Sequence, residues 1–70
     1  MKKLTTKQET VLYFIKRHIL EYDNFPTMAK IGKYFRISRN GAQGYVNILV
    51  HKGYVEKKEG NYRLIKKERK

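Results

Sequence analysis

The sequence predicts a small α+β domain that is mainly helical, with three helices followed by a two-stranded β-hairpin. Apolar residues recur at three- and four-residue spacing in three successive segments, as on the buried side of amphipathic helices. A proline and a short turn separate these segments, and two short strand-like runs around a glycine follow the third segment. A chain of 70 residues has room for one core, so residues 1–70 are expected to form a single domain with its core in about residues 4–65.

The composition argues against several classes of protein. The chain has no cysteine and two histidines, so we expect neither a disulfide framework nor a metal site, and no cofactor. The longest apolar runs, residues 11–15 and 48–50, are too short to span a bilayer, and no apolar signal core follows the basic N-terminus. We therefore expect a cytoplasmic protein with no membrane association and no small-molecule substrate.

The charge of the chain points to a polyanionic partner. Seventeen Lys and Arg residues against six Asp and Glu residues give a formal net charge of +11. Such an excess repels itself in a compact domain and attracts nucleic acid. The alternative is that the basic residues only keep the protein soluble.

The first helix is predicted from about residue 5 to residue 22. Thr5 and Gln8 form one capping box, and Thr6 and Glu9 form the same pattern one residue later. Either Thr5 or Thr6 can therefore be the residue that caps the helix. We expect the buried stripe of this helix to contain Val11, Leu12, Ile15, Ile19 and Tyr22. Tyr13, Phe14 and Leu20 lie outside this stripe, and we expect them to pack under the hairpin or the N-terminal arm rather than to form a dimer face.

The second helix is short and begins at Thr27, after Pro26 has ended the preceding segment. Gly32 lies in the middle of it and costs about 1 kcal/mol relative to alanine. We interpret Gly32 as a position where two helices approach closely. The predicted inner face consists of Met28, Ile31 and Phe35.

The third helix is predicted to begin at the cap residue Ser38 and to end near Lys52, before Gly53. Its inward stripe is expected to contain Ala42, Val46 and Leu49, with Val50 at the flank. The opposite side is short, polar and able to hydrogen-bond; it carries Arg39, Asn40, Gln43, Gly44 and Asn47.

Residues 54–58 and 62–65 predict two strands joined by a turn at residues 59–61, where glycine and asparagine tolerate left-handed conformations. Val55 and Leu64 are expected to face inward, and Lys57, Lys58 and Arg63 to lie on the rim. Residues 66–70 are expected to form a basic tail.

This order of elements is that of a winged helix-turn-helix, and the residues resemble the N-terminal DNA-binding domain of the LexA repressor family over about residues 4–65. No single motif carries the resemblance, which rests on the order of all of them. The matching positions are Leu4, Thr5 and Gln8; Pro26, Thr27, Ala29 and Ile31; Ser38, Asn40 and Ala42; and Leu49, Lys52, Gly53, Val55 and Glu56.

The resemblance implies sequence-specific binding of double-stranded DNA, with the third helix in the major groove and Asn40 as a base contact. We expect a small transcriptional regulator, in a mobile element in view of its size. The self-cleaving Ser-Lys protease domain of that family, which also dimerises, is not among these residues, so a homodimer or a protein partner stays open. The predicted base-reading residues are Arg39, Asn40, Gln43, Gly44 and Asn47. The predicted phosphate-binding residues are Thr27, Lys30, Lys33, Ser38, Tyr45, Lys57, Lys58 and Arg63.

The sequence departs from the family at four of these positions, the first of them Arg39, where the family has a small or rigid residue. Gln43 and Gly44 stand where the family has acidic residues, and a glutamine can bind an adenine edge with two hydrogen bonds, so the family's operator sequence is not assumed. Lys30 replaces a capping-box glutamate in the second helix. A DNA phosphate at that helix's N-terminus would compensate the lysine, although an exposed lysine without a role is an equal alternative.

Two other binding functions stay open. A basic winged-helix domain can also bind or block a protein partner. Binding of single-stranded nucleic acid would require Tyr34, Tyr45, Tyr54 and Tyr62 to line one groove. We do not expect an enzyme, because no acid–base pair is visible and Ser38 is placed as a helix cap rather than as a nucleophile.

Overall fold

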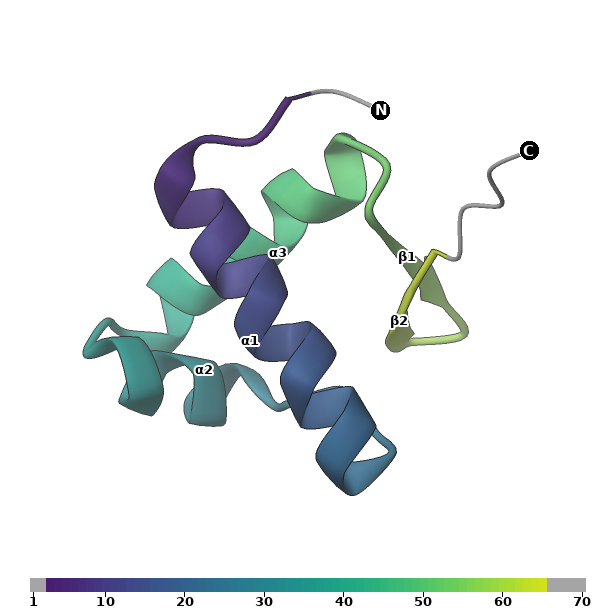
Figure 1. Cartoon of the computed structure of the whole chain (residues 1–70), viewed down its shortest axis with the longest axis horizontal. Coiled ribbons are helices and arrows are strands. Elements are labelled where there is room, and N and C mark those ends of the chain that lie inside the picture. The colour runs from purple at the N-terminus through teal and green to yellow at the C-terminus, as the bar shows by residue number, and fades with distance from the viewer. Residues whose placement is uncertain (1–2, 66–70) are drawn as a thin grey trace.

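A computed structural model describes residues 3–65, and the predicted tail at residues 66–70 lies outside them. The elements are α1 (Thr6–Tyr22), α2 (Met28–Phe35), α3 (Arg39–His51), β1 (Val55–Lys58) and β2 (Asn61–Leu64). The three helices pack together and the antiparallel hairpin flanks them as a wing (Figure 1). This confirms the predicted α+β, winged helix-turn-helix fold.

Helix α1 begins at the first of the two predicted capping boxes. The amide of Gln8 donates to Thr5 Oγ1 at 3.2 Å, and the amide of Thr5 donates to Gln8 Oε1 at 3.0 Å. The helix ends where Asp23 adopts a left-handed conformation with φ of 60° and donates its amide to the carbonyl of Ile19. The two caps satisfy backbone groups that a helix otherwise leaves without partners.

The core lies where the three helices meet the first strand of the wing. Helix α3 contributes Ala42, Val46 and Leu49 to this core, and each of them is 0% exposed. The predicted inward stripe of α3 is therefore confirmed. The buried apolar residues are Val11, Leu12 and Ile15 of α1, Ile31 of α2, Ala42, Val46 and Leu49 of α3, and Val55 of β1.

The inner stripe of α1 differs from the prediction at its C-terminal end. Tyr22 was expected in the core but is 56% exposed, whereas His18 is buried and its Nδ1 lies 2.9 Å from the carbonyl oxygen of Asn24. Figure 1 shows the last turn of α1 projecting beyond the other helices, and Tyr22 is the last residue of this helix. The helical period of apolar residues continues to the last residue of α1, although the neighbouring helices do not extend that far.

The expected packing of Tyr13, Phe14 and Leu20 is also wrong. Tyr13 and Leu20 are 62% and 87% exposed, and neither is covered by the hairpin or the N-terminal arm. Phe14 is half-buried against α2, where its ring centroid lies 4.4 Å from that of Tyr34. The hairpin packs against α3 instead, so this side of α1 has no wing to cover it.

The strands of the wing have bounds that differ by one residue from those predicted. Val55 pairs with Leu64 and Lys58 pairs with Asn61, so Asn61 belongs to β2 rather than to the turn. The two turn residues, Glu59 and Gly60, have φ values of 51° and 81°, the pattern of a tight two-residue hairpin turn. The predicted inward positions are correct, because Val55 is buried and Leu64 packs against the core.

Across residues 3–65, no helix is long and apolar enough to cross a membrane.

Candidate nucleic-acid interface

The orientation of α3 is set by its buried side and its capped start. Ser38 Oγ accepts a hydrogen bond from the amide of Gly41 at 3.0 Å, which confirms the predicted cap. Because Ala42, Val46 and Leu49 are fully buried, the helix cannot rotate about its axis without exposing apolar surface. The opposite side of α3 is therefore held toward the outside.

The predicted base-reading residues lie on this outer side of α3. They differ in how exposed they are and in whether their polar atoms are already hydrogen-bonded within the protein. Arg39, Asn40 and Asn47 are exposed. Gly44 is half-buried, yet a Cβ added to it would meet nothing within 4 Å. Gln43 is also half-buried, and its amide is already bonded inside the protein.

A wing residue that sequence reasoning did not assign to the site reaches α3. The hydroxyl of Tyr62, on β2, accepts a hydrogen bond from Gln43 Nε2 at 2.8 Å. Gln43 Nε2 also donates to Asn47 Oδ1 at 3.0 Å, one helical turn further along α3. The alternation of side chains along a strand could have predicted that Tyr62 faces the helices. Residues 62 and 64 lie on the same side of β2, and Leu64 was predicted to face inward.

Thr27 and Ser38 cap the N-termini of α2 and α3 with their hydroxyl groups. Thr27 Oγ1 accepts from the amide of Lys30 at 3.0 Å, as Ser38 Oγ does from Gly41. Each hydroxyl acts there as an acceptor and keeps its own hydrogen for a further bond. Both residues are exposed, so an anion at either helix start can receive that hydrogen.

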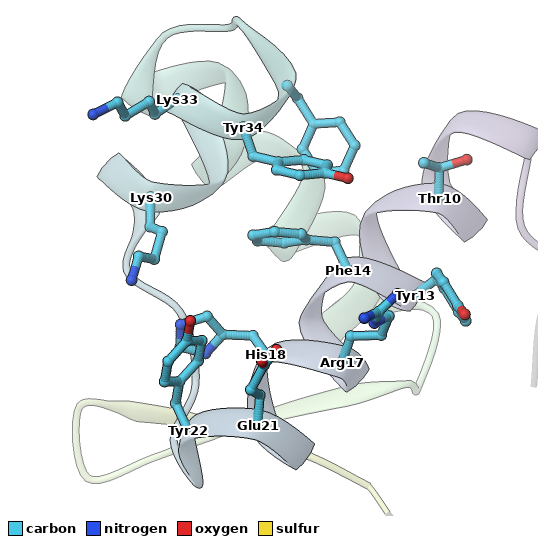
Figure 2. Close-up of a pocket in the computed structure, with 11 residues that line it drawn as sticks. Thr10, Tyr13, Phe14, Arg17, His18, Glu21, Tyr22, Lys30, Lys33 and Tyr34 are labelled. Carbon is cyan, nitrogen blue, oxygen red and sulfur yellow. The ribbon is translucent and has the colours of Figure 1, made fainter.

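The predicted phosphate-binding lysines of α2 lie on a different surface from the polar side of α3. Lys30 and Lys33 line a groove between α1 and α2, and the Lys30 ammonium lies 5.2 Å from the centroid of the Tyr22 ring (Figure 2). Within residues 3–65, no hydrogen bond or ring contact joins either lysine to α3. The residues that line this groove include none of α3.

The cationic side chains of the wing differ in whether they have a partner within the domain. Lys57, Lys58 and Arg63 are exposed, and Arg63 is ion-paired with Glu56 across the hairpin. The Lys57 ammonium lies 5.6 Å from the centroid of the Tyr62 ring. Lys57 is therefore linked through Tyr62 to the outer side of α3, whereas the charge of Arg63 is partly neutralised.

The four tyrosines that a single-stranded nucleic acid would need do not share one groove. Tyr34 lines the groove between α1 and α2, whereas Tyr45, Tyr54 and Tyr62 do not. Tyr45 is half-buried on α3, where it packs against the core. A continuous stacking platform is thus missing from the described part of the chain.

The groove between α1 and α2 has a volume of about 550 Å³ and an aromatic wall. The rings of Phe14 and Tyr34 stack with centroids 4.4 Å apart, and Phe35 meets Phe14 edge-on at 5.5 Å. Figure 2 shows Lys30 and Lys33 extending from α2 on one side of this stack, with Tyr22 and Arg17 projecting from α1.

Comparison with known proteins shows the family of this chain. The model of the LexA DNA binding domain matches residues 1–64. The chain belongs to the LexA DNA-binding domain family. The predicted resemblance is thereby confirmed.

Curated LexA relatives match over almost the whole chain. A LexA repressor from Thermotoga neapolitana is 41% identical over 66 residues, which cover 94% of this chain and 34% of that protein. A LexA repressor from Thermosipho melanesiensis is 42% identical over 65 residues, covering 93% of this chain and 33% of that protein. LexA repressor 2 from Geobacter sulfurreducens is 35% identical, with 93% and 32% covered. The chain thus spans about a third of the length of these LexA proteins.

Proposed function

We propose that this LexA-family domain binds double-stranded DNA sequence-specifically and acts as a small transcriptional regulator. The observation that carries the proposal is the outer side of α3, where exposed Arg39, Asn40 and Asn47 lie opposite a fully buried apolar stripe. Helix-turn-helix proteins present such a helix to the major groove. The activity is binding rather than catalysis.

The proposed contacts divide into two classes. The residues proposed to read base edges are Arg39 and Asn40, near the start of α3, and Gln43 and Asn47 further along it. Gly44 lets the helix approach the bases without a side chain in between. The hydroxyls of Ser38 and Thr27 donate to phosphates at the helix starts, and Lys57 and Lys58 hold phosphates beside the wing. Lys30, Lys33, Tyr45 and Arg63 are proposed as weaker phosphate contacts, because each is turned to another surface or has a partner within the fold.

A random-duplex selection, followed by affinity measurement against salt, tests this proposal. We expect one enriched sequence and a slope of log affinity against log salt of about −4 to −5, from about four to six phosphate contacts. Asn40→Ala is expected to reduce discrimination between bases, whereas Lys16→Ala on the exposed side of α1 changes neither discrimination nor fold. If no sequence is enriched, the domain does not read bases.

The same selection shows whether the chain binds DNA as a monomer or as a homodimer. Two half-sites related by a two-fold axis, about one helical turn apart, would indicate a homodimer on DNA. A single short site with a complex of one chain would indicate a monomer. Sedimentation of the chain with the enriched duplex distinguishes the two stoichiometries.

A second function, binding of a protein partner, is favoured by the groove between α1 and α2. Tyr22 and Tyr34 are 56% and 65% exposed there, and large exposed aromatic residues gathered in one groove are typical of an interaction surface. Arg17, Lys30 and Lys33 line the groove against a single carboxylate, Glu21. A DNA duplex offers phosphates but no large apolar side chain that projects from its surface to fill this space, so we propose an acidic protein segment with one apolar anchor.

This second function has its own test. A displayed library of short peptides, selected against the whole chain, is expected to enrich acidic sequences with one aromatic or leucine residue. Tyr34→Ala should weaken the selected peptide at least tenfold, whereas Asn40→Ala should leave its affinity unchanged. Enrichment of basic or purely polar peptides, or equal losses in both variants, would contradict the proposal.

A further inference from the structure

The side-chain amide of Gln43 has no free hydrogen. A glutamine amide nitrogen carries two hydrogens, and Gln43 Nε2 donates to the hydroxyl of Tyr62 at 2.8 Å and to Asn47 Oδ1 at 3.0 Å. Its carbonyl oxygen, Oε1, receives no hydrogen bond from any group in residues 3–65. Gln43 therefore presents only an acceptor beyond its own network.

Two neighbours contact the ring of Tyr62, which carries the acceptor hydroxyl on the wing. The ring of Tyr62 lies 5.5 Å from that of Phe25, centroid to centroid, and the ammonium of Lys57 lies 5.6 Å from the Tyr62 centroid. Lys57 is also the residue directly opposite Tyr62 in the hairpin. A ring held in this way fixes the position of its hydroxyl, so the bond to Gln43 is part of the folded domain rather than a passing contact.

We infer that Tyr62 determines which bases Gln43 reads. In the major groove, a bidentate adenine contact requires a donor and an acceptor from the same amide. With both hydrogens of Nε2 occupied, Gln43 keeps only Oε1, which accepts from the amino group of either adenine or cytosine. Tyr62 is thus a positioning residue for specificity, and this inference rests on the proposed function.

This reading differs from the expectation based on residue type alone. A glutamine by itself favours adenine through two hydrogen bonds, whereas a glutamate accepts from cytosine. The network gives Gln43 the acceptor character of a carboxylate without its charge. Asn47, whose Oδ1 is used by Gln43, keeps its Nδ2 hydrogens and complements this acceptor with a donor toward guanine or thymine.

Base selection with matched variants tests the inference. The base position that loses its preference in Gln43→Ala identifies the contact. At that position we expect the wild-type chain to accept adenine and cytosine about equally. Tyr62→Phe keeps the ring but removes the hydroxyl, which frees one hydrogen of Nε2 while the other stays with Asn47. Adenine should then be preferred over cytosine by about fivefold or more, the discrimination of a bidentate contact.

Three further measurements keep the test independent of folding and of overall affinity. Tyr13→Phe, an exposed tyrosine of α1 with no hydrogen bond to its hydroxyl in residues 3–65, should leave the base preference unchanged. Gln43→Glu, which can only accept, should keep the preference for amino-bearing bases. In the DNA-free protein, the Gln43 side-chain amide should exchange its hydrogens with solvent faster in Tyr62→Phe than in the wild type.

The outcomes separate this inference from the proposed function. Enrichment of a DNA sequence with strict adenine preference in the wild type, or no change in Tyr62→Phe, would overturn the role of Tyr62 and leave DNA binding intact. A wild-type preference for guanine or thymine at the contact would mean that the amide presents its hydrogens outward, which also overturns it. No enrichment of any sequence overturns the proposed function and this inference with it.

Discussion

The backbone of Gly32, in the middle of α2, lies against the backbone of Ile37 in the turn to α3. A Cβ added to Gly32 would lie 2.7 Å from the carbonyl oxygen of Ile37, and the Ile37 amide donates to the Gly32 carbonyl at 2.9 Å. The glycine was predicted at a close approach between two helices, and the neighbour is the turn between them. The turn that joins the two helices of the motif can fold back this tightly because residue 32 has no side chain.

We predict that Gly32→Ala destabilises the domain by about 1–3 kcal/mol, the usual cost of overpacking. Alanine is the better helix former by about 1 kcal/mol, but the obstacle is a backbone oxygen, which cannot rotate away as a side chain can. Denaturant unfolding followed by circular dichroism measures the change. Equal or greater stability in the variant would show that the turn relaxes without cost.

Gly44→Ala is the matched substitution in α3 and should act in the opposite direction. A Cβ there meets nothing within 4 Å, so we expect a gain of about 0.5–1 kcal/mol in unfolding free energy from helix propensity. The same methyl group would stand between α3 and the DNA. We expect weaker binding to the enriched duplex in a more stable protein, and tighter binding would contradict close approach at this position.

Ser38→Asp separates the capping role of Ser38 from its proposed phosphate contact. Aspartate accepts from the amide of Gly41 as serine does, and its charge suits a helix N-terminus, so stability should be kept. The carboxylate lacks the hydroxyl hydrogen and repels a phosphate. We expect unchanged unfolding and a loss of at least tenfold in DNA affinity, whereas Ser38→Ala should lose about 1 kcal/mol of stability.

Lys57→Gln and Lys58→Gln should each reduce the magnitude of the salt slope by about one, because each removes one phosphate contact. Lys58→Gln is expected to weaken binding to all duplexes alike, without changing the preferred sequence. Lys57→Gln also removes the contact of its ammonium with the Tyr62 ring, so the preferred sequence is compared only for Lys58→Gln. Lys16→Gln carries the same charge change on α1 and should leave the slope unaltered. A uniform effect of all three substitutions would mean that net charge alone attracts the DNA.

Local chemistry made much of the fold predictable. Thr5 with Gln8, Thr27 and Ser38 cap their helices with side chains that reach only three residues, so the bonds depend on nearby sequence alone. The inward stripe of α3 and the inward side of the hairpin follow from the periods of helix and strand. The failures, Tyr22 and the exposed Tyr13 and Leu20, occur where periodicity cannot tell which neighbour is present.

The sequence by itself determined the order of the elements, their caps, the two sides of α3 and the family to which they belong. Only the tertiary structure decided how the polar side of α3 is connected to the rest of the domain. Gln43 and Tyr62 are 19 residues apart, and their hydrogen bond exists because the wing folds back onto α3. Residue type alone indicated a glutamine that could both donate and accept hydrogen bonds. In the fold, Tyr62 of the wing takes one hydrogen of its amide and Asn47 takes the other, so only its carbonyl oxygen remains to bond.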